Sequence, residues 1–122
     1  MKKLSFSKKL RLLTAKNFTF VFDQPQRVNI NKMTILGRSN KLQYPRVGCI
    51  ISKKNIKYSH ERNRIKRLIR ESFRKNQHTL PKEDFVIIIK NGIELFDNYA
   101  LTTGLEKLWH RYRQLFHSAS FY

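Results

Sequence analysis

The stretch from Arg62 to Lys75 carries the side chains best suited to binding a charged ligand. Its 14 residues include five arginines and two lysines, and Glu71 is its only acid. On a helix, a second stripe of apolar and small residues would face the other way: Ile65, Leu68, Ile69, Ser72 and Phe73. Guanidinium groups offer a fork of donors that matches phosphate oxygens. Because solvated helix faces normally mix charges of both signs, this one-signed face favours a polyphosphate partner.

Side chains that could perform catalysis do not form a recognisable set. The eight acidic residues are scattered, and only Glu83 and Asp84 are adjacent. The four histidines have no cysteine or close histidine at the spacing of a metal site, and the sequence has no glycine-rich phosphate loop. We therefore predict no catalytic residue, no metal held by the protein and no cofactor bound by its side chains. Any reacting group would come from a partner molecule or from metal ions held by that partner.

Length and charge restrict the class of protein further. The chain has 122 residues, which suits one domain with one core, and its 40% hydrophobic content is too high for a disordered basic tail. The formal net charge is +18, and residues 1–82 hold 22 of the 26 basic residues but only three of the eight acids. We expect the partner surface in the first two thirds of the chain and a scaffold in the last third.

The cysteine content and the apolar runs indicate a cytoplasmic protein. A single cysteine, Cys49, excludes an internal disulfide and suits a reducing compartment. No apolar run approaches the roughly 18 residues of a membrane span. The basic N-terminus also lacks the apolar segment of a secretory signal. We expect no membrane partner and no small-molecule substrate.

The first half of the chain supplies an arm, a short helix and three strands. Residues 1–13 are predicted to form a basic arm that packs in places, and Thr14 to cap a helix from Ala15 to Asp23. Alternating apolar residues predict strand over residues 27–39, with a bend near residues 31–32. A short apolar run predicts a further strand over residues 46–52, and its composition is typical of a central strand.

The second half supplies the basic helix, one strand and a last helix. We place the cap of the basic helix at Ser59 and its end near Asn76 or Gln77, before a buried strand over residues 85–90. Asp97 or Asn98 can cap the last helix, and residues 118–122 are expected to fray. Strand, helix and strand across residues 46–90 predict a βαβ unit with parallel strands. The order α-β-β-β-α-β-α predicts one α+β domain over residues 1–122, with a mixed sheet.

Two phenylalanines on the first predicted helix have two interpretations. Phe18 and Phe22 are four residues apart and therefore share one face of that helix. They either anchor the helix to the core or lie partly exposed and stack on bases. Such stacking contributes about 1–3 kcal/mol per base in proteins that bind single strands.

Several motifs together resemble the bacterial ribonuclease P protein family over nearly the whole chain. The most specific is Arg62-Asn63-Arg64, which follows a strand that ends in Ser52-Lys53-Lys54. Less specific matches are Arg-Leu-Leu at residues 11–13, the spacing of the two phenylalanines, Arg-Glu-Ser-Phe-Arg at 70–74, Asp-Phe-Val at 84–86 and Leu-Glu-Lys-Leu-Trp at 105–109.

The resemblance implies a fold and a function that composition does not show. The βαβ crossover would be left-handed, against the usual right-handed rule. In this family the RNA subunit is the catalyst and uses bound Mg²⁺ ions to cut the 5′ leader from precursor tRNA. The protein is the accessory subunit of this endoribonuclease: it docks on the RNA subunit and grips the single-stranded leader between the first helix and the sheet.

The resemblance also assigns two sets of site residues by position. The surface that faces the RNA subunit would comprise Arg62, Asn63, Arg64, Lys66, Arg67 and Arg70. The leader-binding cleft would comprise Phe18, Phe22, Ser52, Lys53 and Lys54. This sequence has no glycine shortly after the lysine pair, and it has Leu36 where some members carry an aromatic residue. The preference for a leader sequence is therefore not predicted.

A different class of protein meets many of the same constraints. A module that binds structured RNA, like a ribosomal protein with no part in cleavage, needs the same basic face. The strand exit Ser52-Lys53-Lys54 joined to the Arg-Asn-Arg helix favours the ribonuclease P subunit instead. A duplex-DNA binder is less favoured because no pair of recognition helices and no dimer seam is visible.

Overall fold

The computed structural model describes residues 8–54 and 56–116. In chain order these form η1 (Lys8–Leu10), α1 (Ala15–Asp23), β1 (Gln26–Ile30), β2 (Met33–Ser39), β3 (Arg46–Ile51), α2 (Ser59–Asn76), β4 (Glu83–Ile89), η2 (Ile93–Leu95) and α3 (Asn98–Phe116). The predicted order of helices and strands is confirmed, and the short 3-10 turns η1 and η2 are added to it. Strand β4 begins before the predicted residue 85, and β3 ends one residue early. The expected frayed tail and the first seven residues of the arm lie outside the described residues.

The strands of the described residues form one mixed sheet in the order β1-β2-β4-β3. Strand β4 pairs antiparallel with β2 and parallel with β3, as predicted for the βαβ unit. The prediction that residues 46–52 form a central strand is wrong, because β3 lies at an edge. Its apolar run has another cause: α2 packs on one face, Phe18 of α1 lies against Gly48 on the other, and the N-terminal segment covers part of its free edge. There Arg11 bridges to Val47, and the Leu12 N–H donates to the Val47 carbonyl at 3.0 Å.

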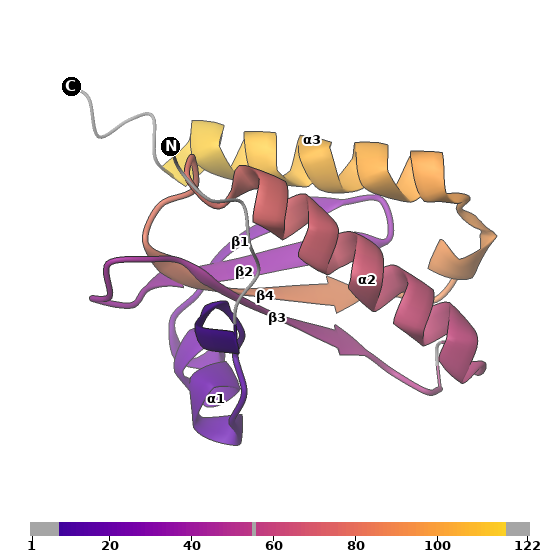
Figure 1. Cartoon of the computed structure of the whole chain (residues 1–122), viewed down its shortest axis with the longest axis horizontal. Helices are drawn as coiled ribbons and strands as arrows, with labels where there is room; N and C mark the ends of the chain where they lie inside the picture. The colour runs from indigo at the N-terminus through magenta and orange to yellow at the C-terminus, as the bar shows by residue number, and fades with distance from the viewer. Residues whose placement is uncertain (1–7, 55, 117–122) are drawn as a thin grey trace.

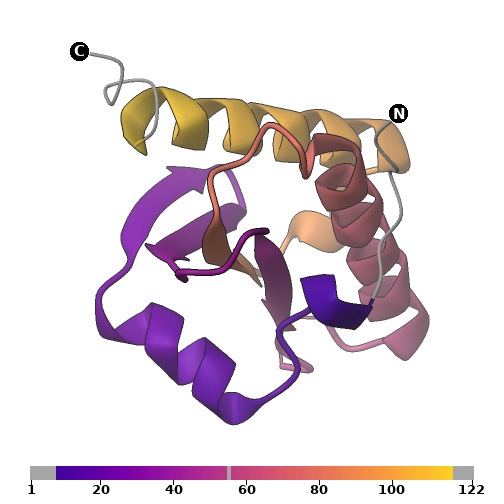
Figure 2. The ribbon, with the colours of Figure 1, turned by 60° about the vertical axis from the view of Figure 1, so that its left-hand side comes forward.

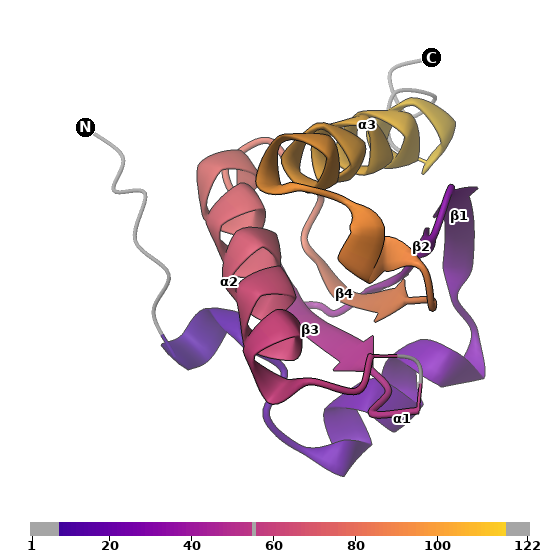
Figure 3. The same cartoon turned by 90° about the vertical axis from the view of Figure 1, so that its right-hand side faces the viewer.

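The crossover from β3 through α2 to β4 is left-handed. In Figure 3 both strands point toward the viewer, α2 lies on the upper left side of the sheet, and β4 follows β3 up and to the right. A chain that runs forward along β3, back through α2 and forward again along β4 turns in the left-handed sense. This confirms the expectation from the family resemblance and departs from the usual right-handed rule.

Helices cover the two faces of the sheet unequally (Figures 1 and 2). Helices α2 and α3 pack on one face and enclose the main core, where the rings of Phe85 and Trp109 meet edge to face at 5.6 Å. Helix α1 lies alone on the opposite face and buries Val21 there. Because α1 has only nine residues, part of this face extends beyond it, and Ile50 and Ile88 stay half-buried.

The helix starts show how far capping could be predicted. Thr14 caps α1 as predicted: its hydroxyl accepts the Asn17 N–H at 3.3 Å, and the Asn17 side chain accepts the Thr14 N–H in return. Asp97 caps α3, because its carboxylate accepts a backbone N–H of the first turn at 2.7 Å. The prediction of Ser59 as the cap of α2 is wrong. Ser59 is already helical, and Tyr58 precedes it without a side-chain capping bond.

A buried hydroxyl ties α3 to three strands. The Tyr112 hydroxyl donates to the Glu83 carboxylate of β4 and lies 2.9 Å from Gln26 Oε1 of β1. Strand β2 approaches the same ring at Gly37, where a Cβ atom would lie 2.1 Å from the Tyr112 oxygen. Only glycine leaves room for this contact. The Tyr112 side chain therefore sets the position of α3 over the sheet.

Replacing Tyr112 by phenylalanine removes this hydroxyl and keeps the ring. We expect Tyr112→Phe to lower the free energy of unfolding by about 1–3 kcal/mol at pH 7, because the buried Glu83 carboxylate loses a hydrogen-bond donor. Urea denaturation of both proteins, analysed with a common m value, measures the difference. Equal unfolding midpoints would show that the hydroxyl does not stabilise the fold.

The same two proteins should also differ in their response to alkali. Burial, and then the hydrogen bond and charge of Glu83, raise the pKa of Tyr112 above its ordinary value. Above about pH 10 an unfolded tyrosine ionises while the folded one keeps its proton, so the unfolded state binds fewer protons and wild-type stability falls. Tyr112→Phe lacks this loss. The difference in stability between the two proteins should therefore narrow as the pH rises above about 10.

Candidate nucleic-acid interface

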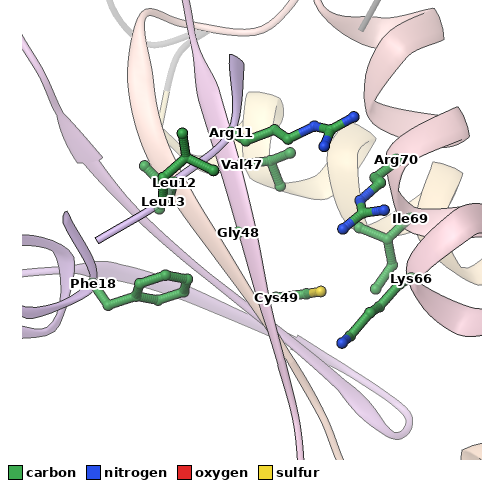
Figure 4. Close-up of a pocket in the computed structure, with 10 residues that line it drawn as sticks. All are labelled: Arg11, Leu12, Leu13, Phe18, Val47, Gly48, Cys49, Lys66, Ile69 and Arg70. Carbon is green, nitrogen blue, oxygen red and sulfur yellow. The ribbon is translucent and has the colours of Figure 1, made fainter. Parts of the chain in front are cut away.

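A pocket of about 190 Å³ opens at the free edge of β3 (Figure 4). Four parts of the chain line it: the segment before α1, α1 itself, β3 and α2. The lining residues are Arg11, Leu12, Leu13, Phe18, Val47, Gly48, Cys49, Lys66, Ile69 and Arg70. The pocket thus connects the face of the sheet that carries α1 with the basic helix on the other face.

Phe18 forms the α1 side of this pocket. Its half-buried ring lies against Gly48 of β3, where a Cβ atom would be only 2.6 Å from the Phe18 Cζ. Glycine therefore lets the ring approach the strand. Phe22, one helical turn later, is 45% exposed. Neither phenylalanine is fully buried, as is required of a side chain that stacks on a base.

The floor beside Phe18 follows from the strand register. Gly48 pairs with Val86, and Ile50 pairs with Ile88. Because alternate residues of a strand share a face, Gly48 and Ile50 both lie on the α1 side of the sheet. Ile50 and Ile88 pack against the small cluster under α1 and stay half-buried. Ile50 and Ile88 thus form a partly exposed apolar surface next to the Phe18 ring.

The predicted Ser52-Lys53-Lys54 segment leaves β3 at the far end of this floor. The Ser52 hydroxyl accepts the Lys54 N–H at 3.0 Å, which forms a tight turn. Both lysines are exposed. The turn therefore presents two cations at the end of the apolar surface.

Two further lysines at this end of the sheet were missed by sequence reasoning. Lys90 follows β4 and Lys32 precedes β2, and both are exposed. The Lys90 N–H donates to the Lys32 carbonyl at 2.9 Å. Met33 and Ile51 both pair with Ile89, and this register brings the strand ends together. No local periodicity in the sequence reveals that register.

Lys66 and Arg70 form the α2 side of the pocket. They flank the buried Ile69 on the helix, and Figure 4 shows their side chains directed toward β3. The resemblance assigned Phe18 to the leader and these two cations to the RNA subunit. The structure places the two sets on opposite sides of one pocket.

Cys49 contributes a thiol to the wall between these two sides. Burial raises the pKa of this thiol, although the nearby charges of Lys66 and Arg70 act in the opposite direction. The thiol is therefore protonated at neutral pH and is not an activated nucleophile. Its place in the wall is that of a small, half-buried side chain.

Arg62 and Arg64 make hydrogen bonds within the chain. Arg62 Nη1 donates to the carbonyls of Ile56 and Lys57, each at 2.9 Å, and so fixes the segment that leads into α2. Arg64 donates to the Asn98 side chain at 2.7 Å and to a backbone carbonyl just before α3 at 3.1 Å. These guanidinium groups therefore hold the basic helix in place.

Asn63, Arg67 and Arg70 are exposed along α2 at helical spacing. The nearby acid Glu71 forms its ion pair with Arg74, and the hydrogen bond from Arg74 lowers the pKa of the Glu71 carboxyl. Glu71 therefore neutralises Arg74 first. The positive stripe at Arg67 and Arg70 remains available to an outside partner.

Residues 8–54 and 56–116 offer neither a metal site nor a membrane-spanning helix. In that part of the chain, no three His, Cys, Asp or Glu side chains gather closely enough to hold a metal ion. Of the helices described there, none combines the length and the apolar character that crossing a membrane requires.

The sequence as a whole is similar to proteins of one family. The family model for Ribonuclease P matches residues 6–113. The Ribonuclease P protein component of Edwardsiella ictaluri is 60% identical over 112 residues, which cover 92% of this chain and 94% of the relative. The corresponding protein of Photorhabdus laumondii is 58% identical over 115 residues, which cover 94% and 97%.

Solved structures share the fold. A mutant RNase P protein from Staphylococcus aureus, described as defective in mRNA degradation, superposes with a TM-score of 0.82 at 22% identity, over 87% of this chain and 90% of that one. The RNase P protein from Thermotoga maritima gives a TM-score of 0.73 at 27% identity, over 83% and 96%. The family model and the relatives show that the chain belongs to the ribonuclease P protein family, as a protein component of the endoribonuclease that processes tRNA.

Proposed function

We propose that this protein docks on the catalytic RNA subunit of ribonuclease P and holds the single-stranded 5′ leader of precursor tRNA while the leader is cut off. The observation that carries the proposal is the pocket at the edge of β3. There Phe18, on α1, lines one side of the pocket, and Lys66 and Arg70, on α2, line the other, so that one strand of RNA would contact an aromatic ring and two cations. Stacking and charge together are the usual means of holding single strands.

The leader would run along the α1 face of the sheet. It would pass Phe18 and Phe22, cross the apolar surface at Ile50, and reach the turn at Lys53 and Lys54. Half-buried apolar side chains with exposed lysines beyond them support this path. Bases would contact the floor, and phosphates would meet the cations at both ends.

The RNA subunit would meet the exposed stripe of α2. Asn63, Arg67 and Arg70 form its outward part, and Lys66 and Arg70 also reach the leader pocket. Arg62 and Arg64 would contribute by holding the helix, through the hydrogen bonds that they make within the chain. One helix thus would serve both RNAs.

Electrostatics explains why such a reaction needs a protein. The two RNAs repel one another, and a protein of net charge +18 placed between them lowers that repulsion. The RNA subunit would hold the Mg²⁺ ions and supply the reacting groups, and the protein would act in the cytoplasm by binding and positioning. The requirement for Mg²⁺ should therefore fall when the protein is present.

Cleavage at low magnesium tests this proposal. Bacterial ribonuclease P RNA is incubated with excess precursor tRNA, with and without the protein. We expect strong stimulation of multiple turnover and a product that ends at the mature 5′ end. If the folded protein binds the RNA but gives no stimulation, it is a structured-RNA-binding module and has no part in cleavage.

Substitution of Phe18 tests the leader path. Phe18→Ala should weaken binding of precursor tRNA to the holoenzyme by about 1–3 kcal/mol, because one base loses its stacking partner. Binding of mature tRNA, which lacks the leader, should not change. Phe18→Leu is the matched control for packing on Gly48, and it should lose precursor affinity while keeping the wild-type unfolding midpoint. Equal losses for precursor and mature tRNA would identify Phe18 as a core residue.

A further inference from the structure

An exposed pair of rings lies at the entrance to α2. Tyr58 and His60 stack with their centroids 5.7 Å apart and their planes inclined by 28°. Tyr58 is 59% exposed, and the Lys57 Nζ lies 5.8 Å from its ring centroid. The pair lies outside the leader pocket and is not among the residues that the family resemblance assigns. The Tyr58 ring thus remains in water beside a cation and a second ring.

The chain holds Tyr58 firmly in this exposed position. Arg62 donates to the carbonyls of Ile56 and Lys57, just before the tyrosine. The Tyr58 carbonyl in turn accepts the N–H groups of Glu61 and Arg62, at 3.1 and 3.2 Å. Both sides of the Tyr58 backbone are therefore fixed. A ligand that stacks on the ring would therefore not have to order the backbone that carries it.

The pair continues the exposed stripe of α2. His60, Asn63 and Arg67 are spaced by three and four residues, so they follow one another along one side of the helix. His60 also lies 3.6 Å from Glu61, and Glu61 is bound by Arg64 at 3.1 Å. The Glu61 carboxylate is therefore paired with neighbouring side chains, and Lys57 adds positive charge beside the Tyr58 ring.

From these observations we propose that Tyr58, backed by His60, is a stacking site for an unpaired nucleobase of the RNA subunit. The inference rests on the proposed docking of that RNA along α2. An unpaired base fits because both of its faces are flat and apolar, while its phosphate can reach Lys57. The RNA subunit is favoured over the leader because the rings adjoin the α2 stripe, whereas the leader pocket opens at Phe18. Under this assignment, Arg62 is a positioning residue that holds the backbone leading into Tyr58.

Binding of the 122-residue chain to bacterial ribonuclease P RNA, measured over a range of salt concentrations, tests the site. Tyr58→Ala should raise Kd about tenfold, because a stacking contact is lost. The slope of log Kd against log salt should not change, since no cation is removed. Tyr58→Phe is the matched control, and it should bind like the wild type. If Tyr58→Phe loses as much affinity as Tyr58→Ala, the ring does not act by stacking.

Arg67→Ala separates failure of this site from failure of the docking surface. It should weaken binding and also reduce the salt slope, because it removes a cation from the stripe. If Arg67→Ala weakens binding and Tyr58→Ala does not, the stacking site is wrong and the docking surface stands. If neither variant affects binding, the docking surface itself is wrong. If Tyr58→Ala weakens only precursor tRNA binding, the rings serve the leader and the assignment to the RNA subunit is overturned.

Fluorescence gives a readout that does not depend on an alanine variant. Tyr58→Trp keeps a stacking ring, and its emission can be distinguished because the only natural tryptophan, Trp109, is fully buried. Binding of the RNA subunit should quench the new exposed tryptophan. Unchanged emission from a saturated complex would show that no base contacts this position.

Discussion

The proposed RNA-binding surface depends on the packing of α2 against β3, in which the Ile69 side chain of α2 is buried. Ile69 faces the core, so its neighbours Lys66 and Arg70 are turned toward the edge of the strand. Helix α2 packs against β3 at the edge of the sheet, while α3 packs over β1 and β2. On the other face, Gly48 lets Phe18 lie close to the same strand. An edge strand only six residues long thus holds together two sets of side chains from distant parts of the sequence.

The sequence predicted what depends on local pattern and missed what depends on strand order. The apolar stripe of α2 and the Thr14 cap are set by neighbours in the chain, so periodicity and capping rules found them. The apolar run of β3 indicated a strand that is shielded from water. A central strand and an edge strand packed against helices can both have such a run, so the pattern did not show that β3 lies at an edge. Lys32 and Lys90 escaped notice because only the pairing register brings them together. Among the assigned site residues, charge alone could not show that Arg62 binds carbonyls of its own chain.

The basic residues of α2 are of two kinds: some bind other groups of the chain, and others are exposed. Only the exposed ones can readily bind RNA phosphates. Arg62 and Arg64 donate hydrogen bonds to backbone and side-chain oxygens of the chain itself, and Arg74 forms an ion pair with Glu71. Arg67 and Arg70 are exposed on the same helix. Arg67 and Arg70 therefore carry exposed positive charge along one stripe of α2, and that stripe adjoins both the pocket at the edge of β3 and the Tyr58 ring. Aromatic rings thus lie beside the exposed arginines, and a partner that bound through charge alone would make no use of those rings.

The single cysteine of the chain gives the most direct test that the pocket receives the leader. Cys49 lies in the pocket wall beside Lys66 and Arg70, so its modification reports on the pocket in the wild-type protein. The measurement is the rate at which a neutral alkylating reagent modifies Cys49 in the holoenzyme, with saturating precursor or mature tRNA. The account predicts that precursor tRNA slows alkylation strongly and that mature tRNA, which has no leader, does not. Equal rates with the two RNAs would contradict it.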